Sequence, residues 1–202
     1  YWVTFILDYL FNENKWKEYL TFKGGTSLSK CFGLIERFSE DIDLILDWRV
    51  LGYEEKEPWI ERSNTKQDKF NREVNEKTEI FLRDEFLKVL EEDLKDMDFE
   101  FSIDTIDPQT ILCKYPKIFE SNYLTQNIRL EIGSLAAWTP AIGVKISPII
   151  SETYPNVFKE KTNIRTVSAE RTFWEKATIL HHEANRPESS PMPHRYARHF
   201  YD

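Results

Sequence analysis

Residues 41–46, with the sequence DIDLIL, alternate polar and apolar side chains. This alternation predicts a β-strand that carries Asp41 and Asp43 on one face and turns Ile42, Leu44 and Leu46 toward a core. Side chains two residues apart on one strand face are separated by about 6–7 Å. The chain must therefore build a sheet that buries one face of this strand while two neighbouring carboxylates project from the other.

The segments around this strand predict helices and strands that do not alternate strictly. Helices are expected over 1–19, 26–32, 68–96 and 169–184, and strands over 19–23, 99–105, 110–116, 127–133 and 143–150. Ser168 is the expected N-cap of the helix over 169–184. Loops are expected over 47–67 and 185–193. This order predicts an α+β or irregular α/β domain with a mixed sheet flanked by helices.

Composition narrows the class of protein. The chain has 202 residues, of which 41% are hydrophobic, and 27 basic against 35 acidic residues give a net charge of −8. These values predict one folded domain and argue against disorder and against a general polyanion binder. No apolar run approaches the roughly 20 residues of a membrane helix. Two cysteines, Cys31 and Cys113, are too few for a disulfide framework, which favours a reducing, cytoplasmic compartment.

A glycine pair lies between the predicted strand over 19–23 and the next helix. Gly24 and Gly25 allow backbone N–H groups to approach an anion closely, and the helix N-terminus favours negative charge. Thr26 and Ser27 add hydroxyl donors at the same place. The turn is thus a candidate phosphate-binding site, although a Gly-Gly pair alone is more often only a turn.

The two aspartates predict a metal site. Carboxylates that project together from a sheet repel each other unless a cation lies between them. Mg²⁺ (or Mn²⁺) suits Asp41 and Asp43, because it takes hard oxygen ligands and leaves positions for water and phosphates. The alternative is a solvated sheet face. The glycine turn upstream favours the metal.

Three ordered motifs resemble a known family. GGTSLSK with RFSEDIDL, within residues 22–46, is similar to the nucleotidyltransferase superfamily, and within it to the AbiEii/AbiGii toxin branch. SAERTFWEKATILHHEANR (168–186) and HRYARHFYD (194–202) also match that branch, so the resemblance spans nearly the whole chain. It implies a nucleotidyltransferase fold over 1–202. We expect the chain to be a fragment that lacks a C-terminal helical part.

The resemblance implies a role for each matching residue. The phosphate-binding turn would consist of Gly24, Gly25, Thr26 and Ser27. Asp41 and Asp43 would be metal ligands, Lys176 would contact the nucleotide phosphates, and Asp202 would be an active-site acid. Lys176 is a flexible point charge suited to a polyphosphate, and Phe173 and Leu180 place it near an apolar helix face.

A third carboxylate has two interpretations. The strand over 127–132 puts Arg129 and Glu131 on one face. Glu131 is either a metal ligand and catalytic acid or base, or one half of a cross-strand ion pair, and the residues alone favour neither. Trp174 is expected in the core rather than as a stacking platform.

The predicted reaction is transfer of a nucleoside monophosphate from an NTP to an acceptor hydroxyl. The resemblance implies the 3′ end of tRNA as acceptor, an antitoxin as protein partner and a place in phage defence. Three alternatives remain: an acceptor that is a protein or small molecule, a non-catalytic nucleotide-binding module, and a metal-dependent phosphohydrolase.

Overall fold

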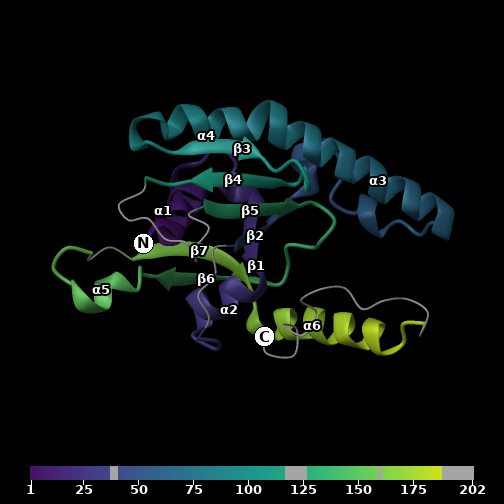
Figure 1. The fold of residues 1–202 in the computed structure, drawn as a ribbon. Helices are drawn as coiled ribbons and strands as arrows, with labels where there is room; N and C mark the ends of the chain where they lie inside the picture. Colours follow the sequence, from purple (N-terminus) through teal and green to yellow (C-terminus); the bar gives the residue numbers. More distant parts are fainter. Residues whose placement is uncertain (37–40, 117–126, 159–160, 188–202) are drawn as a thin grey trace.

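The computed structural model describes residues 1–36, 41–116, 127–158 and 161–187 (Figure 1). The helices are α1 (Trp2–Asp8), α2 (Gly24–Phe32), α3 (Asn64–Phe81), α4 (Leu87–Asp93), α5 (Ile150–Thr153) and α6 (Ala169–Ala184). The strands are β1 (Leu20–Lys23), β2 (Asp41–Leu46), β3 (Glu100–Ile103), β4 (Thr110–Lys114), β5 (Asn127–Gly133), β6 (Ala141–Ile146) and β7 (Thr162–Val167). Short π-helices (Tyr9–Glu13, Leu82–Phe86) and 3₁₀ helices (Lys17–Tyr19, Trp48–Leu51, Glu57–Trp59, Lys95–Met97) complete the helical segments.

The described strands form one sheet in the order β3-β4-β5-β2-β1-β7-β6. β2 is antiparallel to β1 and parallel to β5, and β1 is parallel to β7. The outer pairs are antiparallel. This mixed seven-stranded sheet with flanking helices confirms the α+β prediction.

One face of the sheet builds the main core. Phe22, Ile42 and Leu44 on the central strands have no exposed surface and pack with Leu7 of α1 and Phe86 of the segment between α3 and α4. Figure 1 shows α3 and α4 on the β3 side of the sheet, and α2 and α6 on the side of β6. The carboxylates of β2 belong to the opposite face from this core.

Several predicted elements are confirmed, and the long helices differ. β2, β5 and α6 occupy the predicted ranges, and the Ser168 hydroxyl accepts a hydrogen bond from the Arg171 N–H at 3.3 Å, as expected for an N-cap. The helix expected over 1–19 is α-helical only over Trp2–Asp8; a π-helix follows at Tyr9–Glu13 and a 3₁₀ helix at Lys17–Tyr19. The one expected over 68–96 starts earlier, at Asn64, and also contains a π-helix.

The C-terminal half holds the clearest errors of the sequence prediction. A strand over 143–150 was expected, but β6 covers Ala141–Ile146 and residues 150–153 form α5. β7 was not predicted, although its sequence TNIRTV places alternate residues in the core. None of the helices in the described part of the chain is both long and apolar enough to cross a bilayer.

Candidate active site

Three of the predicted acids lie together on the polar face of the sheet. In the strand register, Asp43 of β2 lies between Lys23 of β1 and Glu131 of β5. Neighbouring strands are about 4.8 Å apart, and directly paired residues share a sheet face. Asp41 is on the same face of β2 as Asp43. The pairing of β2 with β5 therefore gathers Asp41, Asp43 and Glu131, which are distant in sequence.

The electrostatics of Glu131 reflect this crowding. Burial raises the pKa of the Glu131 carboxyl above its usual value, and the negative charges of Asp43 and Asp41 raise it further. Arg129 opposes this shift. The three carboxylates therefore lie close enough to affect one another's protonation, and Arg129 supplies a positive charge beside them. The roles of the three acids as ligands or catalytic groups stay predictions.

The Arg129 guanidinium contacts three carboxylates. Its Nη1 lies 2.7 Å from Asp104 Oδ2, and its Nε lies 3.5 Å from Glu131 Oε1 and 3.9 Å from Asp41 Oδ1. The ion pair considered for Glu131 is therefore present, but within β5 rather than across strands. Asp41 is the cross-strand partner, because it is paired with Arg129 in the register.

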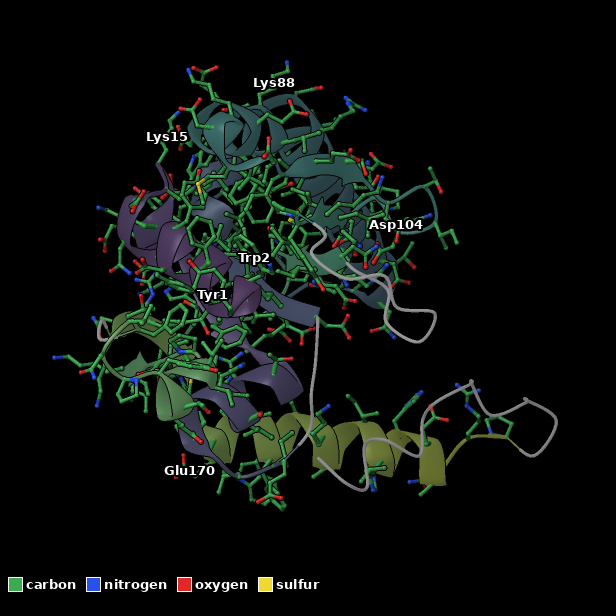
Figure 2. The ribbon with its side chains drawn as sticks, turned by 60° about the vertical axis from the view of Figure 1, so that its left-hand side comes forward. Tyr1, Trp2, Lys15, Lys88, Asp104 and Glu170 are labelled. Carbon is green, nitrogen blue, oxygen red and sulfur yellow. The ribbon has the colours of Figure 1, made fainter. Side chains whose placement is uncertain are left out.

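Asp104 is a residue of this site that the sequence analysis missed. It follows β3 and sits in the turn before β4, where its Oδ1 accepts a hydrogen bond from the Ile106 N–H at 2.9 Å (Figure 2). This N–H and the Arg129 guanidinium lower the pKa of Asp104. The charge of Asp104 thereby fixes Arg129 beside the other acids. The sequence analysis placed Asp104 inside the strand predicted over 99–105, whereas β3 ends at Ile103.

Gly24 brings the glycine turn against the acids. It directly follows β1, has φ +80°, and a Cβ at this position would lie 2.1 Å from Asp43 Oδ2. No side chain fits at this distance, and few residues other than glycine adopt this backbone conformation. The glycine turn therefore lies directly beside the Asp43 carboxylate.

The hydroxyls of the turn are buried. Ser27 has no exposed surface, and its Oγ donates a hydrogen bond to the Gly24 carbonyl oxygen at 2.7 Å, which closes the first turn of α2. Thr26 is 2% exposed, and its Oγ1 has no hydrogen-bond partner among the described residues. Gly25 is buried as well. The role of these residues in phosphate binding stays a prediction.

Lys176 belongs to α6, which packs against α2. Its side chain is partly buried, and its contact with a nucleotide stays a prediction. Figure 2 shows α6 extending away from the sheet from Glu170 onward. Trp174 on this helix is 68% exposed, so its expected core position is wrong. Asp202 and the third motif (194–202) lie outside the described residues, as do residues 37–40 of the first motif.

Asp41, Asp43 and Glu131, here called the acidic cluster, suit a divalent cation that would also bind phosphate oxygens of a substrate. In the part of the chain that the structure describes, no group of three or more His, Cys, Asp or Glu side chains is arranged to hold a metal ion. Mg²⁺ usually takes only one or two carboxylates and completes its shell with water and substrate phosphates. Asp43 and Glu131 are paired in register and supply hard oxygen donors, and their mutual repulsion with Asp41 would be relieved by a cation. The donors therefore fit Mg²⁺ or Mn²⁺.

Comparisons with known proteins agree with the motifs. The family model described as "Nucleotidyl transferase AbiEii toxin, Type IV TA system" matches residues 6–202. Among solved structures, the chain is similar to MenT4, a nucleotidyltransferase toxin from Mycobacterium tuberculosis H37Rv, with 18% identity and a TM-score of 0.48. That match covers 91% of this chain and 56% of the other, so this chain spans little more than half the length of MenT4. No curated protein matched the sequence.

Proposed function

The chain belongs to the AbiEii family of nucleotidyltransferase toxins of type IV toxin–antitoxin systems, and from this we propose that it transfers a nucleoside monophosphate from an NTP to an acceptor hydroxyl. The acceptor oxygen bonds to the α-phosphorus, the bond from that phosphorus to the bridging oxygen breaks, and pyrophosphate leaves. The observation that carries the proposal is the meeting of Asp43, Glu131 and the Gly24 turn at one point of the sheet.

Some of the site residues bind the substrate and others transfer a proton. The turn of Gly24, Gly25, Thr26 and Ser27 holds the triphosphate, because backbone N–H groups at a helix start bind phosphate oxygens. Asp43 and Glu131, which are paired in register, would hold the divalent cation with Asp41 beside them. When bound, Mg²⁺ or Mn²⁺ neutralises charge on the reacting phosphates. Glu131 or Asp202 accepts the proton of the acceptor hydroxyl.

Lys176 completes the phosphate site in this proposal. A lysine ammonium is a mobile point charge that suits a polyphosphate. The contact between α6 and α2 supports its assignment, since α2 begins at the glycine turn.

We further propose the 3′ end of tRNA as the acceptor and a cognate antitoxin as the protein partner, in a phage-defence setting. Both follow from the family. NTP and tRNA meet in the cytoplasm, and we place the protein there.

The test uses the full-length protein with total tRNA, Mg²⁺ and each α-labelled NTP in turn. Label is expected on RNA with wild type and is expected to be lost in Asp43→Asn. Asp68→Asn is the matched control, because Asp68 is an exposed aspartate on α3, away from the acids. It should retain labelling.

The other outcomes decide between the alternatives. Label on protein replaces tRNA as acceptor and keeps the reaction. Free nucleotide released without an acceptor indicates a phosphohydrolase and refutes the proposal. NTP binding without transfer to any acceptor, unaffected by Asp43→Asn, indicates a non-catalytic module.

A further inference from the structure

A pocket of about 250 Å³ opens beyond the end of β2, between the tryptophans Trp48, Trp59 and Trp138. We infer that this pocket receives an unstacked base of the single-stranded acceptor RNA. The inference rests on the proposed function, because it assigns the acceptor a binding site away from the acidic cluster.

The three indole rings form the pocket around one fixed member. Trp48 is 2% exposed, and its Nε1 donates hydrogen bonds to the Glu54 and Glu55 carbonyl oxygens at 3.1 and 3.2 Å. The Trp138 ring lies 4.3 Å from it and the Trp59 ring 5.8 Å, both at a steep angle. Trp59 is 64% exposed and therefore offers a free ring surface at the mouth.

The size and shape of the pocket favour one planar ring system. Drug-sized ligands fill pockets of roughly 300–1,000 Å³, and this one is smaller. Aromatic walls are how proteins hold bases of single-stranded nucleic acids, because every base has a π-face that stacks. A base therefore fits the pocket better than a larger ligand.

Charged side chains of both signs lie beside the rings. Lys56 and Glu55 both line the pocket, and the Arg49 guanidinium lies 5.2 Å from the centre of the Trp138 ring. Arg49 is held there by Asp47, whose Oδ2 is 2.9 Å from its Nε. Lys56 supplies a positive charge for a phosphate of the RNA strand, and a quaternary ammonium ion, which aromatic rings also bind, is the rival occupant.

The pocket is built from segments that follow the two strands carrying the acids. β2 leads from Asp43 to Trp48 and β5 leads from Glu131 to Trp138, and these parallel strands leave the sheet at the same end. β2 ends at Leu46 and Trp48 begins a 3₁₀ helix, so at about 3.3 Å per residue the five steps from Asp43 to Trp48 span at most roughly 17 Å. An RNA strand whose 3′ end lies at the acids can therefore reach the pocket with a nucleotide upstream.

A second link joins the pocket to α6. The Arg171 Nη1 donates a hydrogen bond to the Thr139 carbonyl oxygen at 2.7 Å. Thr139 lines the pocket, and Arg171 is in the first turns of the helix that carries Lys176. Pocket and proposed phosphate site thus share a supporting element.

The test measures binding of a short fluorescent single-stranded RNA to the full-length protein. Trp59→Ala should weaken binding roughly 5- to 150-fold, which corresponds to one lost base–aromatic stack. Trp59→Phe should recover most of the affinity because it restores a ring. The matched control is Trp174→Ala, which removes a tryptophan of similar exposure on α6 and should leave binding unchanged. A duplex RNA of the same length should bind less well, since its bases are already stacked.

Transfer assays separate this inference from the proposed function. Trp59→Ala should raise the KM for RNA and leave NTP binding unchanged. If Trp59→Ala labels RNA with the same KM as wild type, the pocket assignment is wrong and the proposed function stands. If RNA binding depends on Trp59 but no nucleotide is transferred, the proposed function is wrong and the pocket assignment stands. Equal RNA binding by both proteins, or displacement of RNA by tetramethylammonium alone, overturns the pocket assignment.

Discussion

Replacing Gly24 by alanine should disable the site while the fold survives. The new Cβ would lie 2.1 Å from Asp43 Oδ2, whereas real Cβ contacts are essentially never shorter than 3.0 Å. The Asp43 carboxylate must therefore move by about 0.9 Å. Misplacing a reacting group by about 1 Å costs on the order of 100-fold in rate. We expect a loss of that size in nucleotide transfer.

The stability effect of the same change has two parts. An alanine at φ +80° costs about 1–2 kcal/mol because its Cβ crowds the backbone. Gly33→Ala at the other end of α2 carries the same kind of cost, since Gly33 has φ +63°, but a Cβ there meets nothing within 4 Å. Gly33→Ala should therefore lose stability and keep its activity.

The assay pairs urea unfolding with label transfer and Mg²⁺–NTP binding for both variants. A double-mutant cycle with Asp43→Ala, measured on the free energy of unfolding, isolates the steric contact, because removing the carboxylate leaves only the Asp43 Cβ, at 3.1 Å. A coupling of about 0.5–3 kcal/mol is typical of residues in contact. The reasoning is refuted if Gly24→Ala keeps its rate within a few-fold of wild type, or if Gly33→Ala loses as much activity.

Three further changes test the site and its support. Glu131→Gln should raise the free energy of unfolding of the metal-free protein at pH 7, measured by urea unfolding. Because the pKa of Glu131 is raised, the folded state binds the proton more tightly than the unfolded state. The wild-type stability therefore falls as pH rises from 4.5 through the folded-state pKa. The gain should vanish below pH 4.5, and a gain independent of pH would contradict this cause. Asp104→Asn should reduce transfer about 10- to 100-fold, as expected when an outer partner of a metal site is lost, and an unchanged rate would show that Arg129 needs no anchor. Leu44→Ala should lower the free energy of unfolding by about 2–5 kcal/mol, because Leu44 is fully buried, and a loss below about 1 kcal/mol would argue against tight packing under β2.

The parts of the fold that could be predicted from sequence are those with a strong local pattern. DIDLIL gave both the strand and the face on which its acids project. The segment over 127–133 likewise alternates buried and partly exposed residues along all of β5. Ser168 marks the start of α6 because its hydroxyl caps the helix locally.

The contacts of the site depend on pairings that no local pattern encodes. Gly24 meets Asp43 only because β1 and β2 pair in one particular register, with Lys23 opposite Asp43. Glu131 joins the aspartates through the parallel pairing of β2 with β5, which are joined by some 80 residues of chain. Asp104 reaches the acids through Arg129, so its part in the site shows only once both strands are placed.

Tertiary contacts also explain the helical errors. Trp174 looked like a core residue from its size, but α6 buries only Thr172 fully among its residues, since most of the helix extends beyond the sheet. The apolar residues over 68–96 do face the core at helical spacing. It continues through a π-helix at Leu82–Phe86, where Leu82 and Phe86 still point into the core.

The central place of β2 bears on how the protein can be controlled. It is the fourth of seven strands and is hydrogen-bonded on both sides, by β1 and by β5. Amide hydrogens in such a strand exchange with solvent only through the largest opening reactions, close to global unfolding. An inhibitory protein that melts this strand would have to unfold the whole domain. Inhibition compatible with a folded toxin must therefore act from outside the sheet, by covering its polar face or occupying the ends of the strands, and protection of the β2 amides should be the same with and without the inhibitor.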